Sequence, residues 1–558
     1  MVANFWRKMH MSMRKQPLGE IPENTVKVAR RVFRKGNNYM KIADEIGTIY
    51  EFSDFAELFP TTGQSAVNAV RLFLVCILQF AEGLSDREAA EAVRARIDWK
   101  YLLHLDLEDS GFDFSVLSEF RARLVQHEAA QKLFDKLVII LKERGMIKAR
   151  GKQRTDSTHV LAAIRDLNRL ELVHETMRNA LENLATVAPA WLISKASPEW
   201  PERYSRRLFS FNSPKTDKER DKLSQTIGTD GFLLLCAIDS ADDMDWLTKI
   251  PAVIILRAVW EQQYTKPPGP PRFLELTEQP PGAERIVSPH DTDARFSMKR
   301  STEWSGYKLH LTETCDEGLP RCITSVATTP ATKPDWGMLS EVHRSLKRID
   351  ILPADHLVDT GYVSAESIVS SQRDFKVRVV GPPMEDSSWQ AKIKGFDKSY
   401  FKIDWRRLTA TCPANKKNIS WNEDKNGMID IRFRPSDCFK CKYREICARG
   451  TTAAGWPKAR HLELRPQAEH EALIKARALM NDEDFWLRYR ERGGIEGTIS
   501  QAVRTCGART ARYIGFKKQT LQNQLIALAI NVTRLGEWLN GTPLAKTRKS
   551  KLELLCAA

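Results

Sequence analysis

An ordered series of strand and helix signals between residues 304 and 380 constrains the fold more than any other part of the chain. In the run GYKLHLTET, Tyr307, Leu309 and Leu311 alternate with polar residues, which is the period-two pattern of a half-buried strand. CITSVATTP is a second strand signal, PDWGMLSEVHRSLKRI indicates a helix, and HLVDTGY and KVRVVGPP indicate two further strands. About three strands, a helix and then strand–helix–strand predict an α/β fold, with ligands at the carboxyl ends of strands.

Helical patterns dominate the chain before this series. Residues 1–48 form a basic arm with a short helix near Thr25–Phe33, and residues 49–148 form a helical domain. Ser85 is an expected N-cap with Glu88 as its capping-box partner, and a further helix begins at Ser115, again with a capping signal. This domain is expected to bind DNA in helix-turn-helix fashion or to dimerise. The alternative is that its arginines only solvate helix surfaces.

The segments between and after these regions complete the predicted organisation. A helical stretch from His159 to Pro189 opens a helical insertion over residues 161–285, and proline-rich loops close it. Residues 385–465 break the pattern again and contain clustered cysteines. Helical periodicity resumes at Gln467 and continues, with interruptions, to about Leu539, before a basic tail at 541–558.

Composition narrows the class of protein. With 558 residues, 42% apolar and 28% charged, the chain is expected to be soluble and to form three or four folding units. No apolar run reaches the length of a membrane span and no signal peptide is recognisable, so we expect a cytoplasmic protein with no membrane partner. A net charge of +15 favours a nucleic-acid partner, the alternative being a merely basic protein.

Three carboxylates stand in contexts that suit metal-dependent cleavage of DNA. Asp156 lies in QRTDSTHV, Asp359 in HLVDTGY, and Glu496 in RYRERGGIEG. Two divalent ions about 3.5–4 Å apart activate a water and neutralise the attacking and leaving oxygens of a phosphodiester. Each acid also has a simpler interpretation, as a helix N-cap, a turn residue, or the ion-pair partner of Arg492 four residues earlier.

Several ordered blocks make the chain resemble DDE transposases of bacterial insertion sequences: QRTDSTHV, SPHDTDARFSMKRSTEWSGYKLHLTETC, VDTGY, RYRERGGIEGTISQ and GARTARYIGFKKQTLQNQLIALAINVTRL. The segment from FAELFPTTGQ to FSVLSEFRARL resembles the N-terminal helical domain of that family. The resemblance implies a ribonuclease H-like core, a mixed five-stranded sheet flanked by helices, built from residues 149–160, 286–384 and 466–540. The two insertions interrupt this core.

The resemblance also implies roles for single residues. Asp156, at the end of the first strand, Asp359, after the fourth, and Glu496, on a late helix, become the catalytic ligands of two Mg²⁺ or Mn²⁺ ions. Tyr489 and Arg492 keep the family spacing Tyr-x2-Arg-x3-Glu and are expected to face DNA.

The chain departs from the family pattern on both sides of the Glu. A Lys or Arg that contacts end DNA usually stands seven residues after the Glu. Here that position is Val503, and Arg504 is the predicted substitute. Gly493 and Gly494 precede the Glu, and a glycine costs a helix interior about 1 kcal/mol relative to alanine. The helix is therefore expected to kink there or to begin after them.

Two further groups of residues bear on metals and DNA. Thiolates spaced as Cys412, Cys438, Cys441 and Cys447 can close a tetrahedral Zn²⁺ site, so a structural zinc is predicted, the alternative being reduced cysteines in an irregular insertion. A basic run with an aromatic residue suits phosphates and unstacked bases at strand ends, the alternative being a solvated helix face. The predicted DNA contacts in this run are Arg509, Arg512, Tyr513, Lys517 and Lys518.

Together these features predict a transposase that binds the terminal inverted repeats of its element, cuts at the ends and joins the 3′-hydroxyl ends to target DNA. Because two ends must be brought together, a homodimer on double-stranded DNA is expected. The alternatives are a metal-dependent nuclease on the same core without strand transfer, and a non-catalytic DNA-binding protein descended from a transposase.

Overall fold

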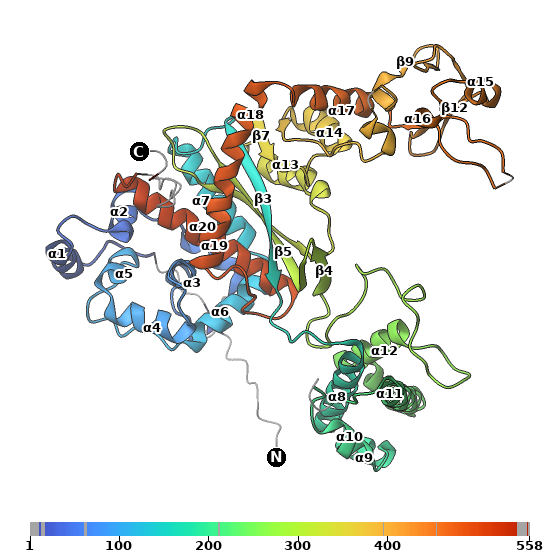
Figure 1. Cartoon of the computed structure of the whole chain (residues 1–558). Helices are drawn as coiled ribbons and strands as arrows, with labels where there is room; N and C mark the ends of the chain where they lie inside the picture. Colours follow the sequence, from blue (N-terminus) through green and yellow to red (C-terminus); the bar gives the residue numbers. More distant parts are fainter. Residues whose placement is uncertain are drawn as a thin grey trace.

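The computed structural model describes residues 17–60, 64–209, 213–393, 395–453 and 455–543, with short stretches at Met11–Ser12 and at Leu555. The start of the predicted basic arm (1–48) and most of the predicted basic tail (541–558) lie outside these residues. Figure 1 shows a main body with two lobes projecting from it. One lobe carries α8 to α12 at the lower right, and the other carries β9 to α16 at the upper right.

A mixed sheet forms the centre of the main body. Its strands are β3 (Lys152–Leu161), β4 (Arg295–Lys299), β5 (Thr302–Thr314), β6 (Ile323–Pro330), β7 (Asp355–Val358) and β8 (Arg378–Val380). The order is β4-β5-β3-β7-β8, and β6 pairs with the second half of β5. β3 is antiparallel to β5, whereas β3, β7 and β8 run parallel. Five of these strands form the predicted mixed sheet, and β4 is an additional strand.

β5 is more deeply buried than its sequence suggests. The alternation from Tyr307 to Thr312 predicts one buried and one exposed face, and this prediction is wrong. Tyr307, Leu309 and Leu311 join the main hydrophobic core, but His310 and Thr312 are each only 1% exposed on the other face. β5 lies between β3 on one edge and β4 and β6 on the other, so its polar side chains are buried among hydrogen-bonding partners.

Helices cover the sheet. α20 (Phe516–Leu539) packs on β6 and on the N-terminal helices. α13 (Met338–Arg348), preceded by the 3-10 turn η3 (Asp335–Gly337), packs on β6 and on α14 (Ala365–Phe375), which lies against β8.

The N-terminal region is helical, as predicted. Its helices are α1 (Glu23–Val32), α2 (Asn38–Glu45), η1 (Phe52–Leu58), α3 (Ala69–Ala81), α4 (Asp86–Ala95), α5 (Ile97–Leu102), α6 (Ser115–Gln126) and α7 (Ala130–Glu143), and a short parallel pair joins β1 (Met11–Ser12) to β2 (Gln64–Ser65). The capping box of Ser85 and Glu88 is confirmed. Ser115 does not cap α6; its own N–H donates to Asp113 instead.

One hydrophobic core runs from these helices into the sheet. It contains residues of α2 and α3, strand residues such as Leu309 and Leu311, and the apolar face of α20. α3 is buried along almost its whole length, because α20 packs against it. The N-terminal helices therefore hold α20 in place over the sheet.

The lower lobe is all helical and has its own core. Its helices are α8 (Arg169–Val187), α9 (Pro189–Lys195), α10 (Trp200–Tyr204), α11 (Asp217–Asp239), η2 (Asp245–Lys249) and α12 (Pro251–Gln263). The prediction that helix begins at His159 is wrong, because β3 continues to Leu161 and α8 starts only at Arg169. Backbone pairing with β5 outweighs the helical periodicity of these residues.

The upper lobe contains small strands that the sequence did not reveal. Its elements are η4 (Trp389–Lys392), η5 (Lys398–Tyr400), β9 (Lys402–Asp404), β10 (Thr409–Thr411), β11 (Asn418–Glu423), β12 (Ile429–Phe433), α15 (Pro435–Phe439), α16 (Arg444–Cys447) and β13 (His461–Leu464). The chain then returns through α17 (Gln467–Leu479), α18 (Glu483–Tyr489), η6 (Arg490–Gly493) and α19 (Gly494–Arg504). The predicted helical stretch from Gln467 to Leu539 is thus confirmed, as are its interruptions. Within the described part of the chain, no helix is long and apolar enough to cross a membrane.

Candidate active site

Strand pairing brings Asp156 and Asp359 together. The parallel pairing of β3 and β7 ends with Thr155 opposite Val358. Asp156 and Asp359 are the residues that directly follow this last pair. The family pattern implied that Asp156 ends its strand, and the alternative was that it caps a helix. Both expectations are wrong, because β3 continues to Leu161. Asp156 lies in the middle of β3, where the strand loses β7 as a neighbour but stays paired with β5. Because β7 ends beside the middle of β3, the carboxylates of Asp156 and Asp359 can meet just beyond the last paired residues of the two strands.

The guanidinium of Arg492 joins both aspartates to Glu496. Its Nη2 lies 2.5 Å from Asp156 Oδ2 and 4.0 Å from Asp359 Oδ2, and its Nη1 lies 3.0 Å from Glu496 Oε1. The predicted pairing of Glu496 with Arg492 is therefore present, as is the turn at Asp359, whose Oδ1 accepts from Gly361 N at 3.0 Å. Arg492 was expected to face DNA. Its side chain is instead 14% exposed and faces the three acids.

Burial and neighbouring charges shift the pKa values of Asp156 and Arg492. Burial, together with the nearby charge of Asp359, raises the pKa of Asp156 to about 6, although Arg492 and the Ser157 N–H oppose the shift. Burial would lower the pKa of Arg492, but the carboxylates of Asp156, Asp359 and Glu496 raise it. Three carboxylates from distant parts of the chain thus meet at one guanidinium, and Lys299 adds a further positive charge near Asp156.

A fourth carboxylate, Asp335, lies beside the cluster and was missed in the sequence. Its Oδ2 lies 3.3 Å from Ser157 Oγ, next to Asp156, and its Oδ1 lies 3.2 Å from Lys308 Nζ. A Cβ on Gly361 would lie 3.2 Å from Asp359 Oδ1 and 3.6 Å from Asp335 Oδ2, so the two acids flank this glycine. The only available signal was that Asp335 follows a strand and precedes a helix, as ligands of α/β sheets often do.

A buried ionic network fixes the helix that carries Glu496. Arg154 Nε donates to Glu313 Oε1 at 2.6 Å, and Arg154 Nη1 donates to the Glu491 carbonyl at 2.5 Å. Glu313 is fully buried and also accepts from Thr498 of α19 and from Arg534 of α20. The network ties β3 and β5 to both C-terminal helices.

Gly494 is required by this network. α19 begins at Gly494 itself, directly after the 3-10 turn that ends at Gly493, so the helix starts within the glycine pair and not after it as expected. A Cβ on Gly494 would stand 2.1 Å from Arg154 Nη1, so no larger residue fits while Arg154 keeps its partners. The departure from helix-favouring residues before Glu496 therefore follows from the close approach of a buried arginine.

We expect Gly494→Ala to destabilise the chain by about 1–3 kcal/mol, because overpacking would displace Arg154. Gly497→Ala is the matched control on the same helix, since a Cβ there meets nothing within 4 Å. That control should be neutral or stabilise by up to about 1 kcal/mol. Denaturant unfolding of both variants checks the result, and equal stabilisation by both would contradict the role given to Gly494.

Buried histidines line the sheet next to the site. His356 Nε2 lies 2.7 Å from Thr155 Oγ1, and His356 Nδ1 lies 2.8 Å from His343 Nε2. His310 Nδ1 lies 2.7 Å from the Tyr362 hydroxyl. Burial lowers the pKa of His310 and of His343 to about 4, and burial with the charge of His343 lowers that of His356 further. All three rings are neutral in the folded chain near neutral pH.

These histidines should make the fold acid-sensitive. Below about pH 6.5 the unfolded chain protonates them and the folded chain does not, so stability falls as pH drops toward about 4, by up to about 1.4 kcal/mol per pH unit for each ring. Thermal unfolding between about pH 7.5 and about pH 5 measures this slope. His310→Gln should reduce the slope of stability against pH by about the contribution of one histidine ring. An unchanged slope would contradict the conclusion that His310 is buried and neutral.

The predicted DNA-binding residues differ in what they contact. Arg509 Nη1 lies 2.7 Å from the His159 ring, Arg512 Nη1 donates to the Leu84 carbonyl at 2.8 Å, and Lys517 pairs with Glu128 at 2.9 Å. The Tyr513 ring packs under Arg121 at 5.2 Å. Arg504 and Lys518 are exposed. Arg512, Tyr513 and Lys517 thus join the start of α20 and the loop before it to the N-terminal helical region.

Tyr489 stands at the end of an aromatic group on α18. Its ring stacks on Phe485 with centroids 6.0 Å apart, and Trp486 lies edge-on at 5.8 Å. Burial, opposed by Arg492, raises the pKa of Tyr489. Trp486 remains 38% exposed and was missed in the sequence, although it lies only three residues from Tyr489.

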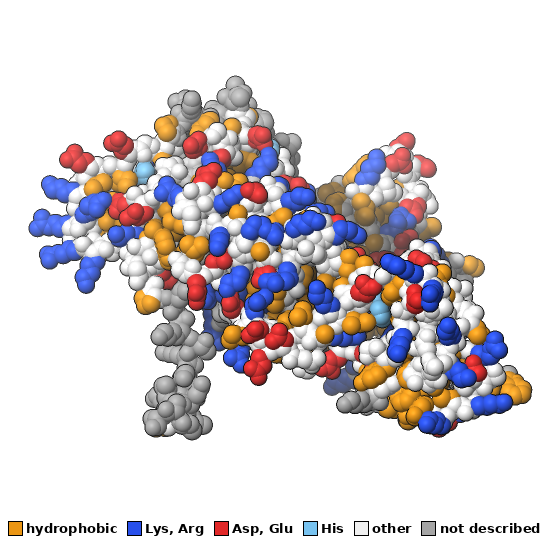
Figure 2. Space-filling view, turned by 90° about the horizontal axis from the view of Figure 1, so that it is seen from above, with side chains coloured by type: hydrophobic (Ala, Val, Ile, Leu, Met, Phe, Trp, Pro, Cys, Tyr) orange, Lys and Arg blue, Asp and Glu red, His pale blue; other side chains and the backbone are white. Residues whose placement is uncertain are grey.

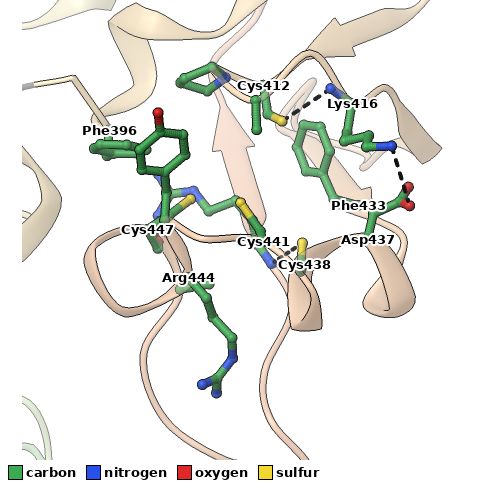
Figure 3. Close-up of a pocket in the computed structure, with 14 residues that line it drawn as sticks. Phe396, Cys412, Lys416, Phe433, Asp437, Cys438, Cys441, Arg444 and Cys447 are labelled. Atoms are coloured by element: carbon green, nitrogen blue, oxygen red, sulfur yellow. Dashed lines mark hydrogen bonds and ion pairs between the residues drawn. The ribbon is translucent and has the colours of Figure 1, made fainter.

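The four clustered cysteines lie around one small cavity in the upper lobe (Figure 3). Cys412 follows β10, Cys438 and Cys447 lie on α15 and α16, and Cys441 lies in the loop between them. Among the described residues, no group of three or more His, Cys, Asp or Glu side chains is already arranged to hold a metal ion. This holds for the cysteines and for the three carboxylates around Arg492.

Two segments of the chain match models of known protein families. Residues 29–123 match the family model described as Transposase domain (DUF772), and residues 411–536 match the one described as Transposase DDE domain. The second match contains Glu496 and the cysteines, while Asp156 and Asp359 lie outside both. No curated protein and no solved structure matches the chain. The chain therefore carries a segment similar to an N-terminal transposase domain and a segment similar to a transposase DDE domain.

Proposed function

We propose that the chain mobilises its own insertion sequence: it binds the terminal inverted repeats, cuts at the ends by metal-dependent hydrolysis and joins the 3′-hydroxyl ends to target DNA. One observation carries the proposal. Asp156, Asp359 and Glu496, which come from three distant segments, share the guanidinium of Arg492. The two transposase family matches give this cluster its chemical context, because the family implies DNA transposase activity, DNA binding and a divalent metal.

The strand order supports a ribonuclease H-like core. In this proposal β3, β5, β6, β7 and β8 are its five strands, and residues 149–160, 286–384 and 466–540 make up the core. Two antiparallel strands on one side of β3 and two parallel strands on the other suit that fold. Residues 161–285 and 385–465 are then insertions, residues 49–148 the DNA-binding or dimerisation domain, and 1–48 and 541–558 basic extensions.

The residues at the site fit divalent cations. Asp156, Asp359 and Glu496 provide hard oxygen donors, which Mg²⁺ and Mn²⁺ prefer. The three carboxylates converge on the guanidinium of Arg492, so their oxygen atoms lie close enough to share bound cations. These three residues would hold two ions, which supply an activated water and neutralise charge on the phosphate oxygens. Asp335 is a further oxygen donor at the edge of the site.

The surrounding residues orient the reaction without forming a covalent bond to DNA. Water and then the freed 3′-hydroxyl attack phosphorus by in-line displacement, so no Ser or Tyr nucleophile is required. β3 and β7 fix the two aspartates, and the Arg154–Glu313 network fixes the helix of Glu496. These rigid supports hold the carboxylates in place as charge develops on the phosphate.

Exposed cations and aromatic rings mark where DNA is expected to lie. Lys and Arg side chains gather at the end of the molecule that carries α1, at the left of Figure 2. On and just after α1 the exposed cations are Lys27, Arg30, Arg31, Arg34 and Lys35. Arg504 and Lys518 are also exposed, and the α18 rings of Tyr489 and Trp486 lie just before the helix of Glu496, so these residues are available to contact an unpaired end. A homodimer would hold two ends together.

A joining assay tests the proposal. The full chain is incubated with Mg²⁺, a target plasmid, and a duplex copied from the DNA that borders its own reading frame, with a free 3′-hydroxyl at the end. Covalent joining of the duplex to the plasmid is expected. Cutting without joining would favour the nuclease, and binding without either would favour a non-catalytic DNA-binding protein.

A further inference from the structure

The strand β4 and the first residues of β5 form a two-stranded ribbon at the edge of the sheet (Figure 1). Residues 302–305 of β5 pair with β4, whereas the pairing of β5 with β3 begins only at Gly306. A two-residue turn follows Lys299 and closes the ribbon. The ribbon therefore extends past the body of the sheet and ends in two exposed cations, Lys299 and Arg300.

Gly306 lets this ribbon fold back over the sheet. A Cβ at Gly306 would overlap the carbonyl oxygen of Val160, and the residue has a φ of +153°, so glycine is required at this bend. Beyond the bend, the buried ring of Trp304 lies with its centroid 5.3 Å from that of the His159 ring on β3. Without the bend, the ribbon would continue along β5 and away from Asp156.

The bend brings the ammonium group of Lys299 to the edge of the carboxylate cluster. Lys299 Nζ lies 3.7 Å from Asp335 Oδ2, and this oxygen also lies 3.3 Å from the hydroxyl of Ser157, the residue after Asp156. Burial raises the pKa of Asp156, and the charge of Lys299 is one of those that oppose this shift. Lys299 is therefore close enough to the acids to act on whatever binds to them.

Asp335 does not depend on Lys299 as a partner. Its Oδ1 lies 3.2 Å from Lys308 Nζ, which also donates to the Lys333 carbonyl at 2.7 Å. The Lys308 side chain is 12% exposed, whereas that of Lys299 is 60% exposed and lies beyond hydrogen-bond length from Asp335. An exposed ion pair of this kind contributes about 0–1 kcal/mol. The ammonium group of Lys299 can therefore exchange Asp335 for a stronger anionic partner.

The helix of Glu496 lacks the cation that the family pattern places on it. The residue seven positions after Glu496 is Val503, which packs against the main hydrophobic core. Arg504 projects from a different side of α19, because successive residues of a helix are about 100° apart. Lys299 supplies a positive charge near the acids from the β4–β5 ribbon instead.

We propose that Lys299 contacts a phosphate of the cut strand next to the scissile bond, the contact that spacing alone assigned to Arg504. The contact rests on the proposed function and names a further DNA-binding residue for it. When end DNA binds, the ammonium group leaves Asp335 and pairs with a phosphate oxygen, while Asp335 keeps Lys308. The charge of Lys299 then positions the strand over the three carboxylates, and no covalent bond to the lysine forms or breaks.

Variants of Lys299 test this contact in the full chain with Mg²⁺ and end DNA. Lys299→Gln, which removes the charge, should lower the rate of cutting by about 10–100-fold. It should also reduce the slope of log affinity against log salt by about one, as expected for one lost phosphate contact. Lys299→Arg should restore both to within a few-fold. Glu303→Gln, which alters an exposed residue of the same ribbon, should leave both nearly unchanged.

Neutral phosphates identify the contacted position. Single methylphosphonates are placed one at a time along the cut strand near the scissile bond. One of them should slow the unmodified chain about as much as Lys299→Gln does, and the two changes together should cost no more than either alone. Additive losses at every position, or unchanged cutting and salt slope in Lys299→Gln, would overturn the contact. A larger loss in Arg504→Gln than in Lys299→Gln would return the role to Arg504.

Failure of this contact differs from failure of the proposed function. If the unmodified chain cuts end DNA and Lys299→Gln cuts equally well, the contact is wrong and the proposed function stands. If the unmodified chain binds end DNA without cutting it, the proposed function is wrong, and the salt dependence of binding still measures the contact of Lys299.

Discussion

Replacing Asp156 by Asn is expected to reduce Mg²⁺-dependent cutting of end DNA by at least about 1000-fold, because a metal contributes several kcal/mol of transition-state stabilisation. Asp156 is the acid held closest to Arg492, and it lies between the two strands that frame the site. Asn keeps the size of the side chain and its hydrogen bond to the Ser157 N–H but loses the charge. Binding of end DNA should change little.

Asp355→Asn is the matched control for this experiment. Asp355 lies at the opposite end of β7 from Asp359 and pairs with Arg378, away from the carboxylate cluster. Its replacement should leave cutting within a few-fold of the unmodified chain, as expected for a surface pair. Equal activity of the Asp156→Asn and Asp355→Asn variants would remove Asp156 from the active site.

The largest expected effect on stability comes from Glu313. Substitution by Leu leaves the guanidinium groups of Arg154 and Arg534 buried without their carboxylate partner. Removing one member of a buried ionic network costs about 3–5 kcal/mol. We expect a loss of that size in denaturant unfolding followed by a probe in the main body. The substitution should also displace α19, which carries Glu496, and so reduce the cutting of DNA.

Glu303→Leu is the control for Glu313→Leu, because Glu303 lies on the same strand but is exposed. Its effect on unfolding should stay within about 0.5 kcal/mol. If Glu313→Leu were also this mild, the network would not be what holds α19 against the sheet, and another contact would have to position Glu496.

The order of elements in the core could be predicted because it depends on local patterns. The strand and helix signals between residues 304 and 380 appear in the structure as β5, β6, α13, β7, α14 and β8, whereas β3 was implied only by the family resemblance. The capping box at Ser85 and the helix start at Gln467 were likewise readable from short stretches. The depth at which side chains of β5 are buried could not be predicted in this way. His310 and Thr312 look solvent-facing in sequence, but tertiary partners such as Tyr362 and Thr155 bury them.

The side chains of the candidate site were likewise predicted only in part. Asp156, Asp359 and Glu496 were chosen from their contexts and a family resemblance, and the fold brings them to one guanidinium. The pairing of Arg492 with Glu496 was one of the interpretations of the sequence, but its contacts with Asp156 and Asp359 could not be predicted, because they depend on packing between distant segments. Asp335 was missed because it lies outside every motif that marked the other acids.

Charge runs were the weakest guide. Arg509, Arg512 and Lys517 suggest a DNA-binding face, yet each contacts another part of the chain. The spacing of the cysteines likewise predicted a zinc site, yet no such group is arranged to hold a metal ion in the described part of the chain. Composition records how many cations and thiols are present, whereas their partners depend on contacts between residues hundreds of positions apart.

Counting bound Mn²⁺ tests the central claim that the three carboxylates form one metal-dependent active site. The titration uses the full chain with end DNA and compares Glu496→Gln with Glu491→Gln, a control five residues earlier whose carboxylate pairs with Lys152. The unmodified chain and Glu491→Gln should each bind two ions, and Glu496→Gln should bind at least one of them about 10–100-fold more weakly. Two ions bound to Glu496→Gln with unchanged affinity would contradict the account.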